Sequence, residues 1–193
     1  MKRLLLVLVV AACGRSTPSP PDSAWHDEPG YRWRSLGVPG RGAAAGFTSL
    51  EPSRTGITFS NTVSESSLVH NRQLAQGAGV CLADVDGDRR PDIFLARTEG
   101  PNALYRNLGD WKFEDVTTSA GVAAPDRVST GCAFADLDGD GDPDLIVASL
   151  GGLNAIFLND GNGNFSEQQR GFTDVAGSMS IAVADVDGAG DLD

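Results

Sequence analysis

Beyond residue 77 the chain alternates short apolar runs with polar turns rich in Gly, Asp, Asn and Pro. The runs are enriched in Val, Ile, Leu and Phe, and they are too short for long helices, which is the pattern of β-strands. No long segment shows a helical period, so the sequence predicts an all-β fold. The expected strands are Gly79–Ala83, Asp92–Arg97, Asn102–Asn107, Lys112–Thr117, Gly131–Ala135, Leu145–Ser149, Asn154–Asn159, Asn164–Gln168 and Ile181–Ala184, preceded by two short candidates at Phe47–Leu50 and Gly56–Ser60.

The expected strands form a repeat. Asn102–Asn107 has its counterpart in Asn154–Asn159, and the next strand of each set carries a matching phenylalanine, Phe113 and Phe165. Four short strands that recur about every 50 residues are typical of β-propeller blades. We therefore expect residues 47–193 to form a partial β-propeller. Its blades would cover about 77–130 and 131–179, and a third would begin at 180–193.

An acidic loop follows the first strand of each repeat. The loops are Asp84–Asp92, Asp136–Asp144 and Asp185–Asp193, with carboxylates at alternate positions and glycines that let the backbone curl. A flexible loop of oxygen ligands suits a hard cation, so we expect Ca²⁺. The expected side-chain ligands are Asp84, Asp86, Asp88 and Asp92, then Asp136, Asp138, Asp140 and Asp144, then Asp185, Asp187 and Asp193, with backbone carbonyls from Arg90, Asp142 and Asp191.

Other readings of the acidic loops fit less well. An EF-hand loop requires Gly at its sixth position, where the first loop has Arg89. A calcium-binding β-helix repeats far more closely than about every 50 residues. A transition metal favours His or Cys, and the loops contain neither. Solvated acidic turns would explain one loop but not three matched copies. The third loop is the weakest candidate, because Ala189 replaces its central carboxylate.

The overall charge and the placement of the histidines argue against two classes of function, nucleic-acid binding and catalysis. The net charge is −11 and the pI is about 4.5, which argues against nucleic acid as a partner. The two histidines, His26 and His70, have no nucleophile or acidic partner placed around them, and no catalytic motif occurs. A glycosidase would need two carboxylates in different environments, whereas these are clustered alike. We therefore expect a protein that is not an enzyme.

The N-terminal segment has the features of an export signal. Lys2 and Arg3 precede a short apolar run, and the segment ends at Cys13 after small residues. This resembles the lipobox of bacterial lipoproteins, which implies lipidation of Cys13 and anchoring to a membrane of the bacterial cell envelope. Gly14 is not the aspartate that retains such proteins at the inner membrane, so the outer membrane is favoured. Residues 14–46, rich in Pro and Gly, are expected to be a tether.

Two further cysteines lie in the repeats. Cys81 and Cys132 occupy equivalent strands but differ by one position in register, because Cys81 aligns with Ala133. One step of register turns a side chain to the opposite face of a strand. A disulfide is therefore left open but disfavoured, and two small buried thiols are the expectation.

The Asp-x-Asp-Gly-Asp-x-x-x-Asp loops between strands resemble the FG-GAP/VCBS repeats of integrin α-subunit propellers. The fuller pattern is more similar to the bacterial relatives of cartilage acidic protein, the ASPIC/UnbV group. It covers Gly56–Phe59, Gly77–Arg97, Asn102–Thr117 and Ala120–Val122. The resemblance implies a seven-bladed propeller with Ca²⁺ in many blades. The chain holds far fewer repeats, so we expect it to be a fragment of a longer protein.

These observations lead to one functional expectation with two alternatives. The first is a calcium-binding, non-catalytic adhesion or binding module, anchored to the envelope by lipidated Cys13. The alternatives are an accessory propeller of an envelope or polysaccharide-handling enzyme system, and a calcium-dependent lectin. The sequence does not identify the protein or glycan partner, since fold does not determine function.

Overall fold

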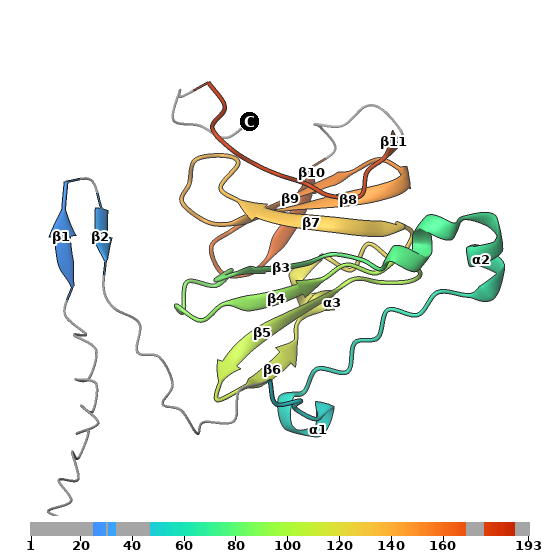
Figure 1. Cartoon of the computed structure of the whole chain (residues 1–193), viewed down its shortest axis with the longest axis horizontal. Helices are drawn as coiled ribbons and strands as arrows, with labels where there is room; N and C mark the ends of the chain where they lie inside the picture. The colour runs from blue at the N-terminus through green and yellow to red at the C-terminus, as the bar shows by residue number, and fades with distance from the viewer. Residues whose placement is uncertain (1–24, 30, 34–46, 169–175, 188–193) are drawn as a thin grey trace, which may run out of the picture. The chain divides into compact units, whose positions relative to one another are not determined.

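The computed structural model describes residues 25–29, 31–33, 47–168 and 176–187. Contacts divide the chain into two units, Met1–Thr48 and Ser49–Asp193. In the first unit, β1 (His26–Glu28) and β2 (Tyr31–Trp33) form an antiparallel hairpin inside the expected tether (Figure 1). The expected signal segment, with Cys13, lies outside the described residues. Among the helices that are described, none has the length and apolar character needed to cross a membrane.

The first sheet of the second unit is a four-stranded antiparallel meander. Its strands are β3 (Val80–Ala83), β4 (Asp92–Leu95), β5 (Ala103–Gly109) and β6 (Lys112–Asp115), paired in chain order. They match the first expected set of strands, with ends that differ by a few residues. The acidic loop Asp84–Asp92 joins β3 to β4, so its two ends are fixed by the pairing of these strands, in which Ala83 faces Asp92.

The second sheet repeats this plan. Its strands are β7 (Ser129–Ala135), β8 (Asp144–Gly152), β9 (Ala155–Asn159) and β10 (Phe165–Gln168), with β11 (Ala176–Gly177) added to the end of β8. Ala135 faces Asp144 across the hairpin, as Ala83 faces Asp92 in the first sheet. The class of fold, all-β and propeller-like, is thus confirmed, and the described sheets form an open stack.

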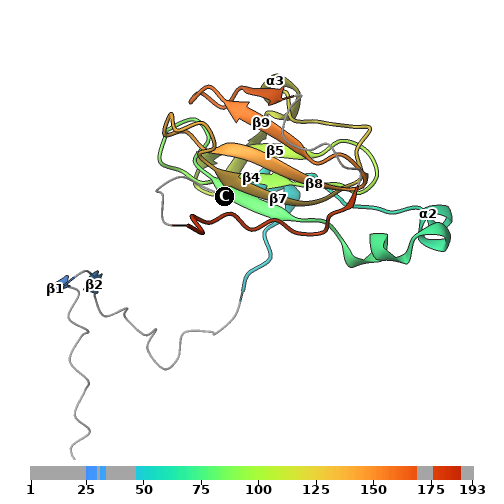
Figure 2. The same ribbon diagram turned by 90° about the horizontal axis from the view of Figure 1, so that it is seen from above.

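The structure departs from the expected strands before the first repeat and after the second. Short helices α1 (Pro52–Thr55), α2 (Glu65–His70), η1 (Arg72–Gln76) and α3 (Thr117–Ala120) connect or flank the strands, and α2 stands out at one end of this unit (Figure 2). The candidates Phe47–Leu50 and Gly56–Ser60 are not strands, and neither is Ile181–Ala184. The strands equivalent to Ile181–Ala184 pair with the strand after their acidic loop, and the described residues 176–187 contain no such partner.

The hydrophobic core lies between the two sheets. Phe94 and Leu104 of the first sheet meet Leu145, Val147 and Phe157 of the second, and all five are almost fully buried. Burial of side chains of this size contributes about 1.5–3 kcal/mol each. The sheets therefore stack face to face, with β7 beside β3 (Figure 1).

Glycines allow successive repeats to approach closely along their first strands. A Cβ on Gly79 would lie 2.9 Å from the Cα of Gly131, and a Cβ on Gly131 would lie 2.9 Å from the carbonyl oxygen of Met179. The Gly79 N–H also donates to the Thr130 carbonyl at 2.8 Å. The segment around Met179 thus lies against the second repeat as the second repeat lies against the first.

The face of the first sheet that points away from the second sheet is partly open. Val80 and Leu82 are each 61% exposed there. On the equivalent face of the second sheet, Leu145 and Val147 are fully buried against the first sheet. The same face of the repeat is therefore packed in the second sheet and open in the first.

The expectation of unpaired cysteines is wrong, because Cys81 and Cys132 form a disulfide with a Cα–Cα distance of 6.0 Å. Cys81 shares its face with Phe94, and Cys132 shares its face with Val147, so both point into the core between the sheets. The step in register does place the thiols on opposite faces of equivalent strands. In a face-to-face stack, however, opposite faces of successive sheets meet each other.

Candidate metal centres in the acidic loops

The first loop brings three carboxylates together. Asp84, Asp86 and Asp88 each offer an oxygen, and these oxygens lie within 4.8 Å of one another. The backbone forms this cluster by turning around Asp84, whose carboxylate accepts from Asp88 N at 3.0 Å and from Arg89 N at 2.7 Å. Side-chain acceptors of this kind stabilise tight turns by replacing backbone partners. The loop thus presents several half-buried acidic oxygens at one point.

The second loop also brings three carboxylates together, with its closing aspartate as the third member. Asp136, Asp138 and Asp144 offer oxygens within 4.8 Å of one another. Asp136 accepts from Gly139 N at 2.8 Å and from Gly141 N at 3.0 Å. Both glycines have positive φ, 83° and 94°, a conformation that favours residues without a side chain.

The last aspartate of each loop is fully buried and holds the hairpin together. Asp92 accepts from Val85 N at 3.0 Å and from Asn107 N at 2.7 Å. Asp144 accepts from Leu137 N at 2.8 Å and from Asn159 N at 2.8 Å. Each carboxylate therefore bridges its own loop to the third strand of its sheet, which is a structural role that the sequence reasoning missed.

Asn159 adds a connection between the repeats. Its Nδ2 donates to the carbonyl of Val85, inside the first acidic loop, at 2.9 Å, and to the Pro143 carbonyl at 3.2 Å. In the first repeat, Asn107 Nδ2 donates to the Pro91 carbonyl at 2.9 Å. The sequence signal for this role was the asparagine that ends both aligned hairpin segments.

The clusters do not include every expected ligand. Asp92 is outside the first cluster, and Asp140 is outside the second. Asp140 instead accepts from the N–H of Asp142 at 2.9 Å. In the first loop, Arg90 forms an ion pair with Asp88 and donates from Nε to the Asn107 carbonyl at 2.8 Å.

In the third loop, Asp185 and Asp187 belong to the described residues, whereas Asp191 and Asp193 do not. The expected third set therefore lies partly outside the part of the chain that the structure describes.

The carboxylates of both loops are arranged so that a cation would relieve their electrostatic strain. Desolvation raises the pKa of Asp92, and the charges of Asp86 and Asp88 raise it further against the opposing hydrogen bonds from Asn107 and Val85. Desolvation also raises the pKa of Asp138, with a contribution from the charge of Asp140. A divalent ion between such carboxylates would favour their ionised forms. The donor set, made only of oxygens, fits Ca²⁺.

Two stacked antiparallel sheets, each with an acidic loop between its first two strands, define a propeller-type repeat protein. The model of the FG-GAP-like repeat matches residues 84–147 and 136–193, which together cover more than half of the chain. The chain therefore belongs to the FG-GAP-like repeat family.

Curated relatives support this family assignment. Cartilage acidic protein 1 from Xenopus tropicalis is 32% identical over 111 residues, which are 58% of this chain and 17% of that protein. The human protein of the same name is 35% identical over 82 residues, 42% of this chain and 12% of that protein. The chain thus matches only a small part of the length of these relatives.

Proposed function

We propose that this chain is a calcium-binding, non-catalytic binding module with an adhesive role, held at the bacterial cell envelope by a lipid on Cys13. The observation that carries the calcium proposal is the pair of aspartate clusters in the equivalent loops of two repeats, which share their first two positions. An accidental acidic turn would not be expected to recur with the same buried closing aspartate. Membership of the FG-GAP-like repeat family supports the proposal.

The role of Ca²⁺ in this proposal is structural. Each cluster lies in the connection between two paired strands, β3–β4 and β7–β8, so an ion would fix the loop against its hairpin. The affinity expected for extracellular modules of this kind is about 10⁻⁴–10⁻³ M. At such an affinity the loops fill where calcium is abundant, which agrees with a position outside the cytoplasm.

The disulfide gives independent support for an exported protein. Cys81 and Cys132 are joined between the two sheets, and structural disulfides form and persist in oxidising compartments. Anchoring through Cys13 is tested by a Cys13→Ser variant expressed in bacteria. The lipid proposal predicts that wild type fractionates with membranes and that the variant does not. If both proteins appear in the same soluble fraction, the anchor is refuted.

Calorimetric titration of the full chain with Ca²⁺ tests the metal proposal. We compare wild type with the double variant Asp86→Asn/Asp138→Asn, which removes one carboxylate from each cluster. The control is Asp110→Asn/Asp126→Asn, which removes the same charge from two exposed positions outside the clusters. Wild type and control should bind Ca²⁺ and melt at a calcium-dependent temperature, whereas the cluster variant should lose both properties.

Two results would refute the metal proposal. One is a folded wild type, judged by circular dichroism, that takes up no Ca²⁺ at millimolar concentration. The other is equal calcium binding by the cluster variant and the control, which would place the ions elsewhere.

A further inference from the structure

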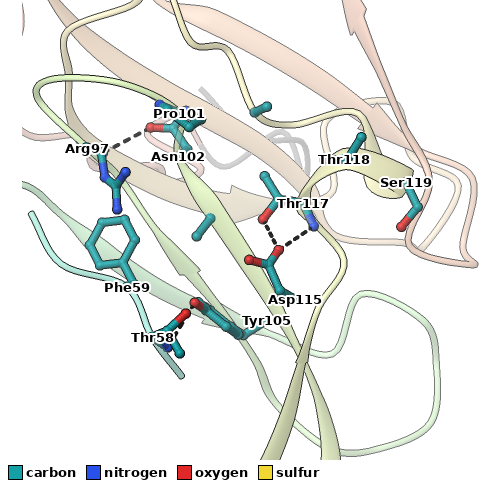
Figure 3. A pocket seen from close by; sticks show the side chains of 12 residues that line it. Thr58, Phe59, Arg97, Pro101, Asn102, Tyr105, Asp115, Thr117, Thr118 and Ser119 are labelled. Atoms are coloured by element: carbon teal, nitrogen blue, oxygen red, sulfur yellow. Dashed lines mark hydrogen bonds between the residues drawn. The ribbon is translucent and has the colours of Figure 1, made fainter. Parts of the chain in front are cut away.

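A pocket of about 640 Å³ opens beside the first sheet, and Figure 3 shows the side chains that line it. Residues distant in sequence form its walls: Phe59 before α2, Arg97 after β4, Tyr105 of β5 and Asp115 of β6, with the hydroxyls of α3 at its margin. The volume lies within the range of small-molecule sites. None of the expected calcium ligands contributes to it.

Arg97 is the positive group of this pocket. Its guanidinium lies over the ring of Phe59, with 4.5 Å from Cζ to the ring centroid, and Figure 3 shows the side chain extended toward that ring. Its Nε is buried and has no hydrogen-bond partner among the described residues. Arg90, Arg106 and Arg127 each pair with a carboxylate, and of these three only Arg106 also has a buried Nε without a hydrogen-bond partner among the described residues. Arg97 is therefore held in place by stacking, with unsatisfied hydrogen-bonding capacity.

The opposite wall offers groups that recognise hydroxyls. One oxygen of Asp115 accepts from Thr117 N at 3.0 Å and from Thr117 Oγ1 at 2.5 Å, which fixes the carboxylate (Figure 3). The Tyr105 hydroxyl oxygen accepts from Thr58 N at 3.2 Å. Asp115 is exposed, and its second oxygen can still accept a hydrogen bond, whereas Tyr105 is only 1% exposed and its hydroxyl positions the Thr58 backbone.

We propose that this pocket binds an acidic sugar unit, of the hexuronate class. The carboxylate of such a unit matches the planar fork of Arg97, which can bind it through two parallel N–H groups. Its ring hydroxyls match the Asp115 acceptor and the hydroxyls of Thr118 and Ser119. An acidic peptide fits less well, because a second carboxylate near Asp115 would be repelled and the pocket walls offer side-chain hydroxyls instead.

The inference deepens the proposed binding function by naming a ligand class, but it does not require metal in the loops. Binding is therefore measured on the full chain twice, in Ca²⁺ and in chelator, so that failure of the sugar site and failure of the calcium sites are distinguishable. The probes are a galacturonate dimer, the neutral galactose dimer of the same linkage and a tetraglutamate peptide, each titrated by calorimetry.

Wild type should bind the acidic dimer at least tenfold more tightly than the neutral dimer and the peptide. Arg97→Met should lose this preference, whereas the control Arg54→Met, at an exposed arginine of α1, should keep it. Arg97→Lys retains the positive charge but not the planar guanidinium, so it should bind the acidic dimer with intermediate affinity. This variant replaces Arg97→Met in the test if Arg97→Met fails to fold. Equal binding of both dimers by wild type, undiminished binding by a folded Arg97 variant, or tighter binding of the peptide would overturn the proposal.

Discussion

Removing the disulfide should cost a large part of the stability of the two-sheet unit. Cys81 and Cys132 are separated by 51 residues in sequence, so their bond closes a long loop in the unfolded chain. The chain-entropy relation gives about 4 kcal/mol for a loop of this length at 25 °C. The double variant Cys81→Ala/Cys132→Ala should therefore unfold more easily by up to about this amount, and it also loses the packing of two sulfurs between the sheets.

The assay is urea unfolding followed by circular dichroism. The background is Cys13→Ser, which excludes exchange with the remaining cysteine, and the comparison is between the double variant and its parent with and without a reductant. Reduction of the parent should lower its stability toward that of the double variant, and reductant should leave the double variant unchanged. Equal stability of parent and double variant would refute the reasoning. So would alkylation of Cys81 and Cys132 in the unreduced, unfolded parent, since it would show free thiols.

Three further predictions concern packing, hydrogen bonding and pH. Leu145→Ala, in the core between the sheets, should cost about 2–5 kcal/mol in urea unfolding, whereas Leu82→Ala, on the open face, should cost less than about 0.5 kcal/mol. Asn159→Ala should cost about 1–3 kcal/mol in the same assay, because it leaves buried carbonyls unpaired. Hydrogen bonds, above all the one from the Asn164 side chain, hold the pKa of Asp160 below its usual value. The contribution of Asp160 to stability is therefore present above its unfolded pKa and is lost as the pH falls through its folded pKa. In an NMR titration, Asn164→Ala should shift the Asp160 midpoint upward.

The sequence predicted the repeats and the loops well because residues close together in the chain define both features. Alternating carboxylates and glycines define the loops Asp84–Asp92 and Asp136–Asp144 without reference to the rest of the fold. The matching segments Asn102–Asn107 and Asn154–Asn159 likewise allow the order of the strands in each repeat to be predicted. What the sequence did not predict is the function of the closing aspartates, since their backbone partners become apparent only when a third strand lies beside the loop.

The errors and omissions arose where distant segments meet. A comparison of Cys81 and Cys132 as members of equivalent strands disfavours the disulfide, whereas the relation that decides it is between opposite faces of stacked sheets. The pocket was missed for a similar reason: Phe59, Arg97 and Asp115 belong to different elements, and no short motif connects them. The pattern of a single sequence indicates which residues form the strands of one sheet, but it does not indicate which residues of different sheets contact each other.

The contacts between the repeats also bear on how the candidate metal centres are stabilised. Asn159, in the second sheet, donates to the carbonyl of Val85 in the first acidic loop. Gly163 of the next turn lies beside the Val85 side chain, where a Cβ on the glycine would make an ordinary contact at 3.5 Å. Asn159 also accepts from Gly163 N at 3.2 Å, which links that turn to the same residue. The first loop is therefore held by its own hairpin and by the repeat that follows it. Ordering of a loop and packing of the next repeat should then be coupled, so that an ion bound in the first loop stabilises the stack of two sheets rather than one hairpin alone.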